Sequence, residues 1–458
     1  MMLDPQESKN LKQSYTKKLT YFIRLKWILF RLLEQLSEIK AKFQAEDASK
    51  SQLFNSPQLV EKEAGFIWLY LSTIGELNAI KPLIDQMIDR VGQNRLVFIT
   101  DHEHYIAPFL NAYPEVNVFY TRGASKDVFL LSQQKKPCLF IIGEIPLALS
   151  DAPCRFSFAF IYYAKCQETP IMVVNGWLYR QHPSCLIDTI ENKLFRQDFF
   201  CLIDSYGVQN NDVREYLKSN DVDELNIYLM GNIKFDRLQL GEKPKVTESN
   251  WVNFLDASDK KCIVAGCVSE LDEQQFVLSS FEKICEENKN VILVLAPRHP
   301  EFIERMDALE SELKEREFVY QRCSKGGILD IENVQVIVLD TMGELRNYYA
   351  FSDVSYVGTD HNVLEPLAFS KSVIVRGGWF TGYPSYPVYK TMLDEGVIEE
   401  CLTDEAFSNA CLALFNQSND SLDGGKHIRE TVASHKGATD IAMSKLKEFG
   451  WLRMIENE

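Results

Sequence analysis

The sequence predicts an α/β protein with two domains, each a mostly parallel β-sheet with helices on both faces. Short apolar runs rich in β-branched and aromatic residues alternate with amphipathic stretches along most of the chain. The chain has 458 residues, of which 46% are hydrophobic, and this is enough for two cores. We therefore expect two Rossmann-like halves of similar length.

The first expected element is a basic amphipathic helix within residues 1–45. The segment from Leu19 to Leu36 is apolar, but Arg24, Lys26 and Arg31 make it too charged for a transmembrane span. Residues 1–45 carry a net charge of +5, whereas the whole chain carries −16. Cations among aromatic and leucine residues fit a helix that lies on an anionic membrane surface. Packing on the protein's own body is the alternative.

The first domain is expected over residues 65–238, after a polar loop at 46–64. Its strands are predicted at 67–71, 95–100, 116–121, 138–142, 171–175, 199–204 and 226–231. A polar linker is expected at 239–251. The second domain, residues 259–425, has predicted strands at 261–266, 291–297, 334–340, 354–358 and 372–377. Residues 426–458 are expected to be helical and to pack back on the body.

A carboxylate, Glu76, stands where the first strand of the body gives way to a helix. Ser72, Thr73 and Gly75 supply the turn, and apolar residues then recur at helical spacing. An acid in the first helical turn can simply stabilise the helix dipole. The carboxyl ends of parallel strands are also where open α/β sheets bind their ligands. Glu76 is therefore either a cap or part of a site.

Polar residues follow several other predicted strands. Arg298 and His299 precede a possible helix start at Pro300, where an arginine and free N–H groups suit a phosphate. A surface ion pair is the alternative for Arg298. Lys234 follows the last strand of the first domain, where a structural role is equally open. The remaining candidates lie in two loops of the second domain: Thr341, Gly343, Glu344, His361, Asn362 and Glu365.

Composition narrows the class of protein. The net charge of −16 argues against nucleic acid as a partner. Eleven cysteines without a Cys-x-x-Cys pair indicate reduced thiols in a cytosolic protein. The chain has no Asp-x-Asp pair or His/Cys cluster that would suggest a metal, and the histidine pair in Asp101–His104 is expected in a surface loop. We expect neither a metal nor a cofactor.

Several motifs together resemble the bacterial Kdo transferases. They are "STIGELNAIKPLI", "GNIKFD", "APRHPEF", "DTMGELRNYYAFSDVSYVG" and "HNVLEPLA", spread over residues 65–415. The resemblance implies a GT-B glycosyltransferase architecture, with two Rossmann-like domains facing a central cleft. It implies inverting transfer of 3-deoxy-D-manno-oct-2-ulosonic acid (Kdo) from CMP-Kdo to a lipid A precursor (lipid IVA) in lipopolysaccharide core biosynthesis. The location it implies is the cytoplasmic face of the inner membrane, as a peripheral protein.

The same resemblance suggests roles for individual residues. It makes Glu76 the general base, and it places Arg298 and His299 at the CMP phosphate. Apart from the resemblance, the positive charge of Lys234 suits the negative charge of the departing nucleotide. The other residues that the resemblance assigns to the donor are Thr341, Met342, Gly343, Glu344, Asn362 and Glu365.

The sequence also departs from that family pattern. The loop "AGCVSELDE" (265–273) lacks a histidine that the family has, and "GTDHN" (358–362) shortens a glycine-rich loop. Trp177 replaces an arginine, and Glu144 stands for the second acid of an acidic segment only with a one-residue gap. These changes leave three alternatives open. They are a CMP-sugar transferase with a capsule or other glycan acceptor, a sugar-nucleotide epimerase or hydrolase, and a non-catalytic GT-B binding protein.

Overall fold

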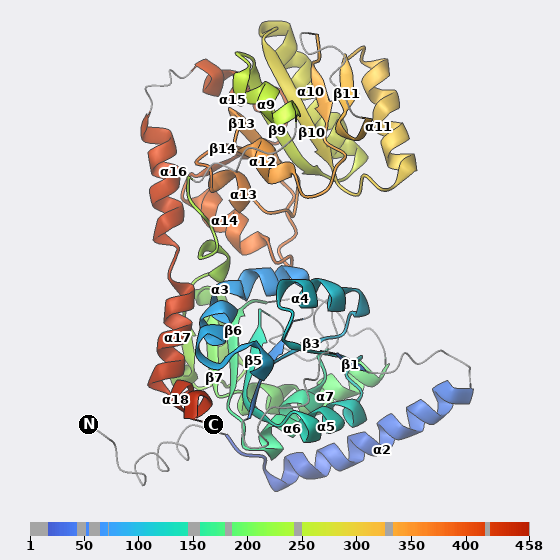
Figure 1. Cartoon of the computed structure of the whole chain (residues 1–458), viewed down its shortest axis with the longest axis vertical. Coiled ribbons are helices and arrows are strands. Elements are labelled where there is room, and N and C mark those ends of the chain that lie inside the picture. The colour runs from blue at the N-terminus through green and yellow to red at the C-terminus, as the bar shows by residue number, and fades with distance from the viewer. Residues whose placement is uncertain are drawn as a thin grey trace. The chain divides into compact units, whose positions relative to one another are not determined.

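The computed structural model describes residues 17–43, 52–54, 65–71, 73–144, 156–178, 186–241, 250–325, 333–416 and 422–457. The chain forms two compact units (Figure 1). Unit 1 contains residues 1–237 and 436–458, and unit 2 contains residues 238–435. Parts of the predicted loop at 46–64 and of the predicted linker at 239–251 lie outside the described residues.

The described strands of unit 1 form an eight-stranded sheet in the order β1-β4-β3-β2-β5-β6-β7-β8. All neighbours are parallel except β1, which pairs antiparallel with β4 at the edge. The strands are β1 (Gln52–Phe54), β2 (Phe66–Tyr70), β3 (Leu96–Thr100), β4 (Asn117–Tyr120), β5 (Pro137–Gly143), β6 (Ile171–Gly176), β7 (Ser205–Val208) and β8 (Ile227–Leu229).

Helices cover both faces of this sheet, which explains why its central strands are apolar throughout. On β2, Ile67 and Leu69 pack under α3 (Ile74–Val91) and α4 (Ile106–Ala112), whereas Tyr70 faces the aromatic rings near α6 (Phe158–Cys166). The other helices of the unit are α2 (Tyr21–Phe43), α5 (Ser125–Gln134), α7 (Leu186–Leu202), α8 (Asn211–Ser219), α17 (Ala438–Glu448) and α18 (Trp451–Asn457). Short 3-10 turns are η1 (Gln93–Arg95), η2 (Glu103–Tyr105), η3 (Glu224–Asn226) and η4 (Ile233–Phe235).

The predicted strand at 199–204 is wrong, because residues 199–202 are the last of helix α7 and the next two connect it to β7. Phe195, Phe199 and Phe200 are buried at helical spacing, so one face of the helix, not a strand, packs on the sheet. The strand follows directly as β7. A short apolar run is compatible with either structure, and here the longer helical pattern decides.

The described strands of unit 2 form a seven-stranded, all-parallel sheet in the order β11-β12-β10-β9-β13-β14-β15. Helices α10 (Leu271–Glu287), α11 (Ile303–Glu315) and α15 (Asp404–Asn416) pack on one face. The strands are β9 (Lys261–Val268), β10 (Val291–Pro297), β11 (Tyr320–Arg322), β12 (Val336–Val338), β13 (Val354–Val357), β14 (Ser372–Val375) and β15 (Ile398–Glu400). The other elements are α9 (Asn250–Ala257), η5 (Cys323–Lys325), α12 (Leu345–Tyr349), α13 (Leu364–Leu367), α14 (Tyr386–Asp394) and α16 (Leu422–Ser434).

The helices of residues 426–458 divide between the two units. Helix α16 belongs to unit 2, where Arg429 approaches Ser370. Helices α17 and α18 complete the core of unit 1 with Trp451 and Ile455, and Asp236 accepts hydrogen bonds from the N–H groups of Gly437 and Thr439. Unit 1 is therefore built from two separate stretches of the chain.

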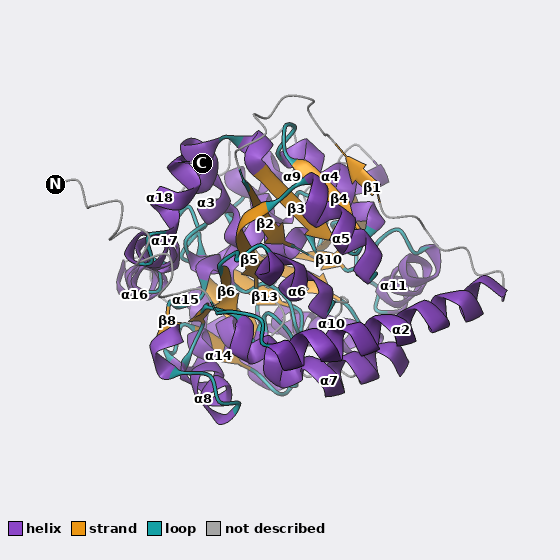
Figure 2. Ribbon diagram, turned by 90° about the horizontal axis from the view of Figure 1, so that it is seen from below, coloured by secondary structure: helices purple, strands orange, loops and turns teal. Residues whose placement is uncertain are grey.

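Helix α2 lies along α7 on the outside of unit 1 (Figures 1 and 2). Its Trp27 and Phe30 are buried against Phe195, and Lys26 forms an ion pair with Asp198. One face of the helix therefore packs on the body, as the alternative interpretation of the sequence expected. The opposite face is exposed and apolar. No helix among the described residues is long and apolar enough to cross a membrane.

Candidate functional site

In unit 1, polar side chains gather where the parallel strands end. Glu76 lies in the first turn of α3, directly after β2, and only 3% of its surface is exposed. The hydroxyl of Thr73 accepts a hydrogen bond from the backbone N–H of Glu76 at 3.2 Å. Thr73 and Glu76 thus have the spacing of a capping box, and the carboxylate is also buried at the ligand-binding edge of the sheet. Both interpretations of Glu76 fit this position.

Glu144, at the end of β5, is buried and paired with Lys234. The distance between Lys234 Nζ and Glu144 Oε1 is 2.6 Å, and Asn175 Nδ2 donates to the same oxygen at 3.4 Å. Asn175 also accepts from the backbone N–H of Ile233 at 3.0 Å, which fixes the turn that carries Lys234. The structure joins Lys234 to Glu144 at the carboxyl edge of the unit 1 sheet, and the assignment of Lys234 to the donor stays a prediction.

In unit 2, one buried carboxylate holds together two loops at the carboxyl ends of the parallel strands. Glu273, in the first turn of α10, accepts from the N–H of Ser269 at 2.9 Å and from the N–H of Thr359 at 2.8 Å. The Ser269 hydroxyl lies 3.1 Å from Nε2 of His361. The sequence analysis did not single out Glu273 or Ser269. Glu273 could have been found from the sequence, because it is an acid in the first turn of a helix that follows a strand, as Glu76 is.

Arg298 and His299 follow β10, beside these loops. Burial, together with the charges of Arg298 and His299, lowers the pKa of His361 to about 4. The three side chains therefore lie close together. Among the described residues, the Arg298 guanidinium has no hydrogen-bond or ion-pair partner, whereas His299 contacts Glu301 at 2.9 Å. The helix expected at Pro300 begins later, at Ile303. An unpaired guanidinium beside two imidazoles is suited to an anion.

The loop after β12 carries four of the candidate residues. Thr341 hydrogen-bonds to Glu344, Gly343 has a φ of 84°, and Met342 is 81% exposed. Glu344 is the residue directly before the short helix α12, and its side chain makes no capping hydrogen bond to the described residues of that helix. A left-handed turn of this kind favours glycine, so Gly343 has a conformational reason to be present. The loop thus lies at the same edge as Arg298, one strand further along the sheet.

Asn362 and Glu365 follow β13, as expected. The Asn362 side chain accepts from the backbone N–H of Leu364 at 3.2 Å, so part of its role is to begin α13. Burial and the nearby charge of Glu365 raise the pKa of the Cys267 thiol to about 12. Glu365 therefore lies close to the end of β9, next to the loop that holds Ser269.

Five non-glycine residues at these strand ends adopt left-handed backbone conformations. They are Glu144, Asn175, Cys267, His299 and Asp360, with φ between 56° and 66°. Such conformations cost on the order of 1 kcal/mol or more each and concentrate at functional sites. Their occurrence on both carboxyl edges supports both edges as functional.

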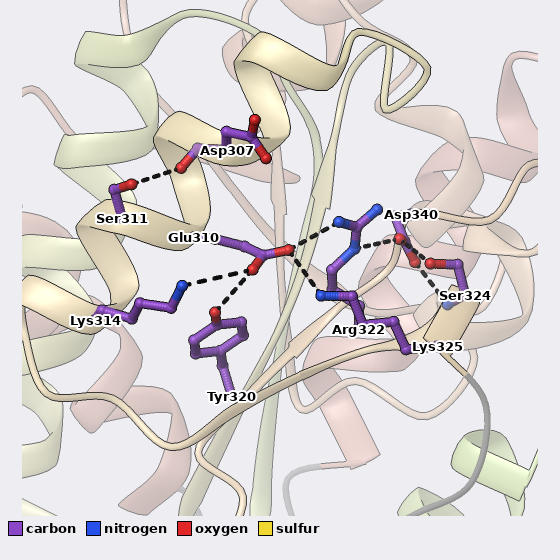
Figure 3. A network of polar contacts seen from close by, with 9 residues as sticks. All are labelled: Asp307, Glu310, Ser311, Lys314, Tyr320, Arg322, Ser324, Lys325 and Asp340. Atoms are coloured by element: carbon purple, nitrogen blue, oxygen red, sulfur yellow. Dashed lines mark hydrogen bonds and ion pairs between the residues drawn. The ribbon is translucent and has the colours of Figure 1, made fainter.

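A polar network anchors the loop after β12 to the edge of the sheet (Figure 3). Arg322 donates to Asp340 at 2.7 Å and to Glu310 at 2.8 Å, and Lys325 lies 3.2 Å from Glu310. The hydrogen bonds from Arg322 and Lys325 lower the pKa of Glu310 to about 2, against the opposing effect of burial. Asp340 also accepts from the N–H of Ser324 at 2.8 Å. Arg322 therefore joins β11, α11 and the start of the loop.

Arg322→Ala should loosen this loop. The Asp340 side chain is 1% exposed and would lose its guanidinium partner, at a cost of about 1–3 kcal/mol in the stability of unit 2. We expect faster amide hydrogen exchange at residues 341–345, measured by mass spectrometry. Lys314→Ala is the matched control, because Lys314 is exposed and lies 3.9 Å from Glu310. Equal exchange in both variants would show that Arg322 does not anchor the loop.

Comparison with known protein sequences gives relatives that are named as glycosyltransferases. No family model matches the chain. A bifunctional glycosyltransferase/methyltransferase of Fusobacterium nucleatum is 24% identical over 329 residues, which are 68% of this chain and 47% of that protein. The 3-deoxy-D-manno-octulosonic acid transferase of Haemophilus influenzae is 30% identical over 234 residues, which are 50% of this chain and 52% of that protein. The chain therefore spans about half the length of these two curated relatives.

Solved structures show the same fold. The UDP-GlcNAc 2-epimerase of Neisseria meningitidis, bound to UDP-GlcNAc, matches with a TM-score of 0.57 at 14% identity, over 83% of this chain and 99% of that one. A glycosyltransferase of Rickettsia africae matches with a TM-score of 0.55 at 11% identity, over 85% and 99%. The predicted fold class, two Rossmann-like domains of the GT-B type, is confirmed.

Further relatives in sequence carry the same name as the protein of Haemophilus influenzae. Other 3-deoxy-D-manno-octulosonic acid transferases, from Chlamydophila psittaci, Rickettsia felis and Rickettsia prowazekii, are 21 to 26% identical over 66 to 85% of this chain. The chain is thus a homologue of the 3-deoxy-D-manno-octulosonic acid (Kdo) transferases.

Proposed function

We propose that the protein transfers Kdo, with inversion, from CMP-Kdo to a lipid A precursor such as lipid IVA. The observation that carries this proposal is the buried carboxylate of Glu76 at the carboxyl edge of unit 1, in a homologue of Kdo transferases. Unit 1 would act on the acceptor and unit 2 would bind the nucleotide. The reaction needs no group beyond the two substrates and the residues of the chain.

In this mechanism an acceptor hydroxyl attacks the anomeric carbon of Kdo as the bond from that carbon to the phosphate oxygen breaks. Glu76 takes the proton of the hydroxyl, a role that needs a carboxylate within hydrogen-bond reach. CMP leaves with the bonding electron pair, and fixed positive groups stabilise the negative charge that develops on its phosphate. Arg298 supplies such a group, because its guanidinium is unpaired among the described residues.

Incubation with CMP-Kdo and a panel of acceptors, followed by mass spectrometry, tests the proposal. We expect one or more Kdo residues on lipid IVA and free CMP in equal amount. Kdo on a capsule or other glycan acceptor, but not on lipid IVA, would assign a different acceptor. Release of free Kdo without transfer would indicate a hydrolase, and an unchanged donor would contradict the proposal.

Arg298→Ala should weaken CMP binding by roughly 10- to 100-fold, because a charge-assisted hydrogen bond to phosphate is worth about 1.5–3 kcal/mol. Calorimetry with CMP measures the change. Arg453→Ala is the control, since Arg453 is an exposed arginine on α18 in unit 1. Unchanged affinity in Arg298→Ala would place the phosphate elsewhere.

We also propose that α2 attaches the protein to the anionic membrane that contains the acceptor. Two aromatic residues of this helix, Trp27 and Phe30, are buried and therefore unavailable to the bilayer, and Lys17 donates to the carbonyl of Ile203. The exposed face nevertheless carries Tyr21, Phe22, Leu25, Ile28, Leu29, Leu32, Leu33 and Leu36. Arg24 and Lys18 are exposed beside them. Such a face fits insertion at the membrane interface.

The full-length protein should sediment with anionic liposomes, and salt should weaken this binding because part of it is electrostatic. Phe22→Glu with Leu29→Glu should abolish it, while CMP binding remains. Deletion of residues 1–45 is the poorer test, because it would expose the partners of Trp27. Leu225→Glu, an exposed apolar position on η3, is the control. Persistent sedimentation of the double variant would contradict this role of α2.

A further inference from the structure

A cluster of histidine, tyrosine and aspartate side chains follows β3. Asp101 Oδ1 lies 2.8 Å from Nδ1 of His102, so the carboxylate orients that imidazole and leaves its other nitrogen outside this contact. The rings of His104 and Tyr105 are 4.1 Å apart, and those of His102 and His104 are 5.4 Å apart. The sequence analysis expected only a surface loop here.

This cluster lies beside Glu76. Strand β3 pairs in parallel with β2, with Ile99 opposite Tyr70, so the residues that follow the two strands emerge next to each other. Burial raises the pKa of Tyr105, and the negative charges of Glu76 and Asp101 raise it further. The phenol group and the carboxylate of Glu76 are therefore neighbours. Helix α3 carries Glu76, and helix α4 begins directly after Tyr105. These two helices also pack on each other.

The chemistry of the cluster favours a hydroxyl-rich, uncharged group. Three carboxylates, those of Glu76, Asp101 and Glu103, lie in or next to it, so an anion would be repelled. Carboxylates and imidazole nitrogens accept hydrogen bonds from hydroxyl groups. The rings of His104 and Tyr105 offer an apolar surface with a polar tip, which matches the C–H face and the hydroxyl rim of a sugar. Among the described residues, no group of His, Cys, Asp and Glu side chains could hold a metal ion.

We propose that Asp101, His102, His104 and Tyr105 form the subsite that binds the sugar ring of the acceptor and presents its hydroxyl group to Glu76. This inference rests on the proposed function, because it assigns the acceptor of that reaction to this cluster. Tyr105 and His104 contact the ring, and His102, held by Asp101, accepts from a hydroxyl. The ligand is recognised through its sugar ring and not through a phosphate.

Binding of a glucosamine disaccharide, with and without phosphate groups, tests the subsite in the full-length protein. We expect saturation-transfer NMR and calorimetry to show binding of both forms with affinities within a few-fold of each other. His104→Ala and Tyr105→Ala should weaken both by at least fivefold, with CMP affinity unchanged. His427→Ala is the matched control, because His427 is exposed on α16 in unit 2. In transfer assays the same variants should raise the acceptor KM and leave the donor KM unchanged.

Three results would overturn the subsite: no binding of either disaccharide, binding of the phosphorylated form alone, or wild-type affinity in both variants. Failure of the proposed function looks different. In that case the wild type transfers no Kdo, whether or not it binds the disaccharide. If the wild type transfers Kdo and both variants keep its acceptor KM, the function stands and the subsite is wrong.

Discussion

Glu76→Gln should lower kcat for Kdo transfer by roughly 100-fold or more, because general-base catalysis contributes about that much or more. Glutamine has nearly the same size and also serves in a capping box, so the start of α3 should persist. Melting curves and CMP binding should stay close to those of the wild type. The measurement is a steady-state transfer assay at saturating donor and acceptor.

The control for this variant is Asp212→Asn, which changes an exposed first-turn acid on α8 in the same way. It should alter neither kcat nor stability. If Glu76→Gln retains kcat within a few-fold of the wild type, Glu76 is a helix cap and not the base.

Asp204→Asn should cause the largest loss of stability among these variants. Asp204 and Lys165 form an ion pair whose two side chains are fully buried, and Asp204 also accepts from the N–H groups of Ile171 and Lys17, each at 2.7 Å. Removal of one charge leaves the buried ammonium of Lys165 unpaired, at a cost of about 3–5 kcal/mol. For a unit of this size that corresponds to a fall in the melting temperature of roughly 10 °C.

Calorimetry of the full-length protein measures this shift in the transition of unit 1. Asp394→Asn is the matched control, because it removes an exposed partner from the surface pair with Lys390 and should leave the transition unchanged. The double variant Lys165→Met with Asp204→Leu should recover much of the loss, since it leaves no unpaired charge. A single variant as stable as the wild type would show that the pair contributes nothing.

The two-domain α/β fold followed from the sequence because most strands are buried on both faces and read as continuous apolar runs. Such runs locate β5, β6, β9 and β10 to within about two residues. Short edge strands carry no such pattern, so β1, β11 and β15 were not predicted. The apolar run at 199–204 was wrongly predicted as a strand, because phenylalanine is as common in strands as on the buried face of a helix such as α7.

The candidate site was predicted only as far as local sequence can show it. The sequence identifies acids and cations that follow strands, which is why Glu76, Arg298 and Glu365 stood out. It does not show which loops are neighbours, since that depends on the order of strands in the sheet. The contact between Ser269 and His361, and the cluster of Asp101 and Tyr105 beside Glu76, each join loops far apart in sequence.

The division of unit 1 into residues 1–237 and 436–458 has a consequence for synthesis of the protein on the ribosome. Unit 2 is one continuous stretch, so it can fold as soon as that stretch has emerged. The earlier part of unit 1 must wait, with the apolar surface that Trp451 and Ile455 later cover still open to water. During this interval the nascent chain is exposed to aggregation, and chaperones that bind apolar surface have their target there. A stall in translation before α17 would therefore leave a finished unit 2 attached to an unfinished unit 1.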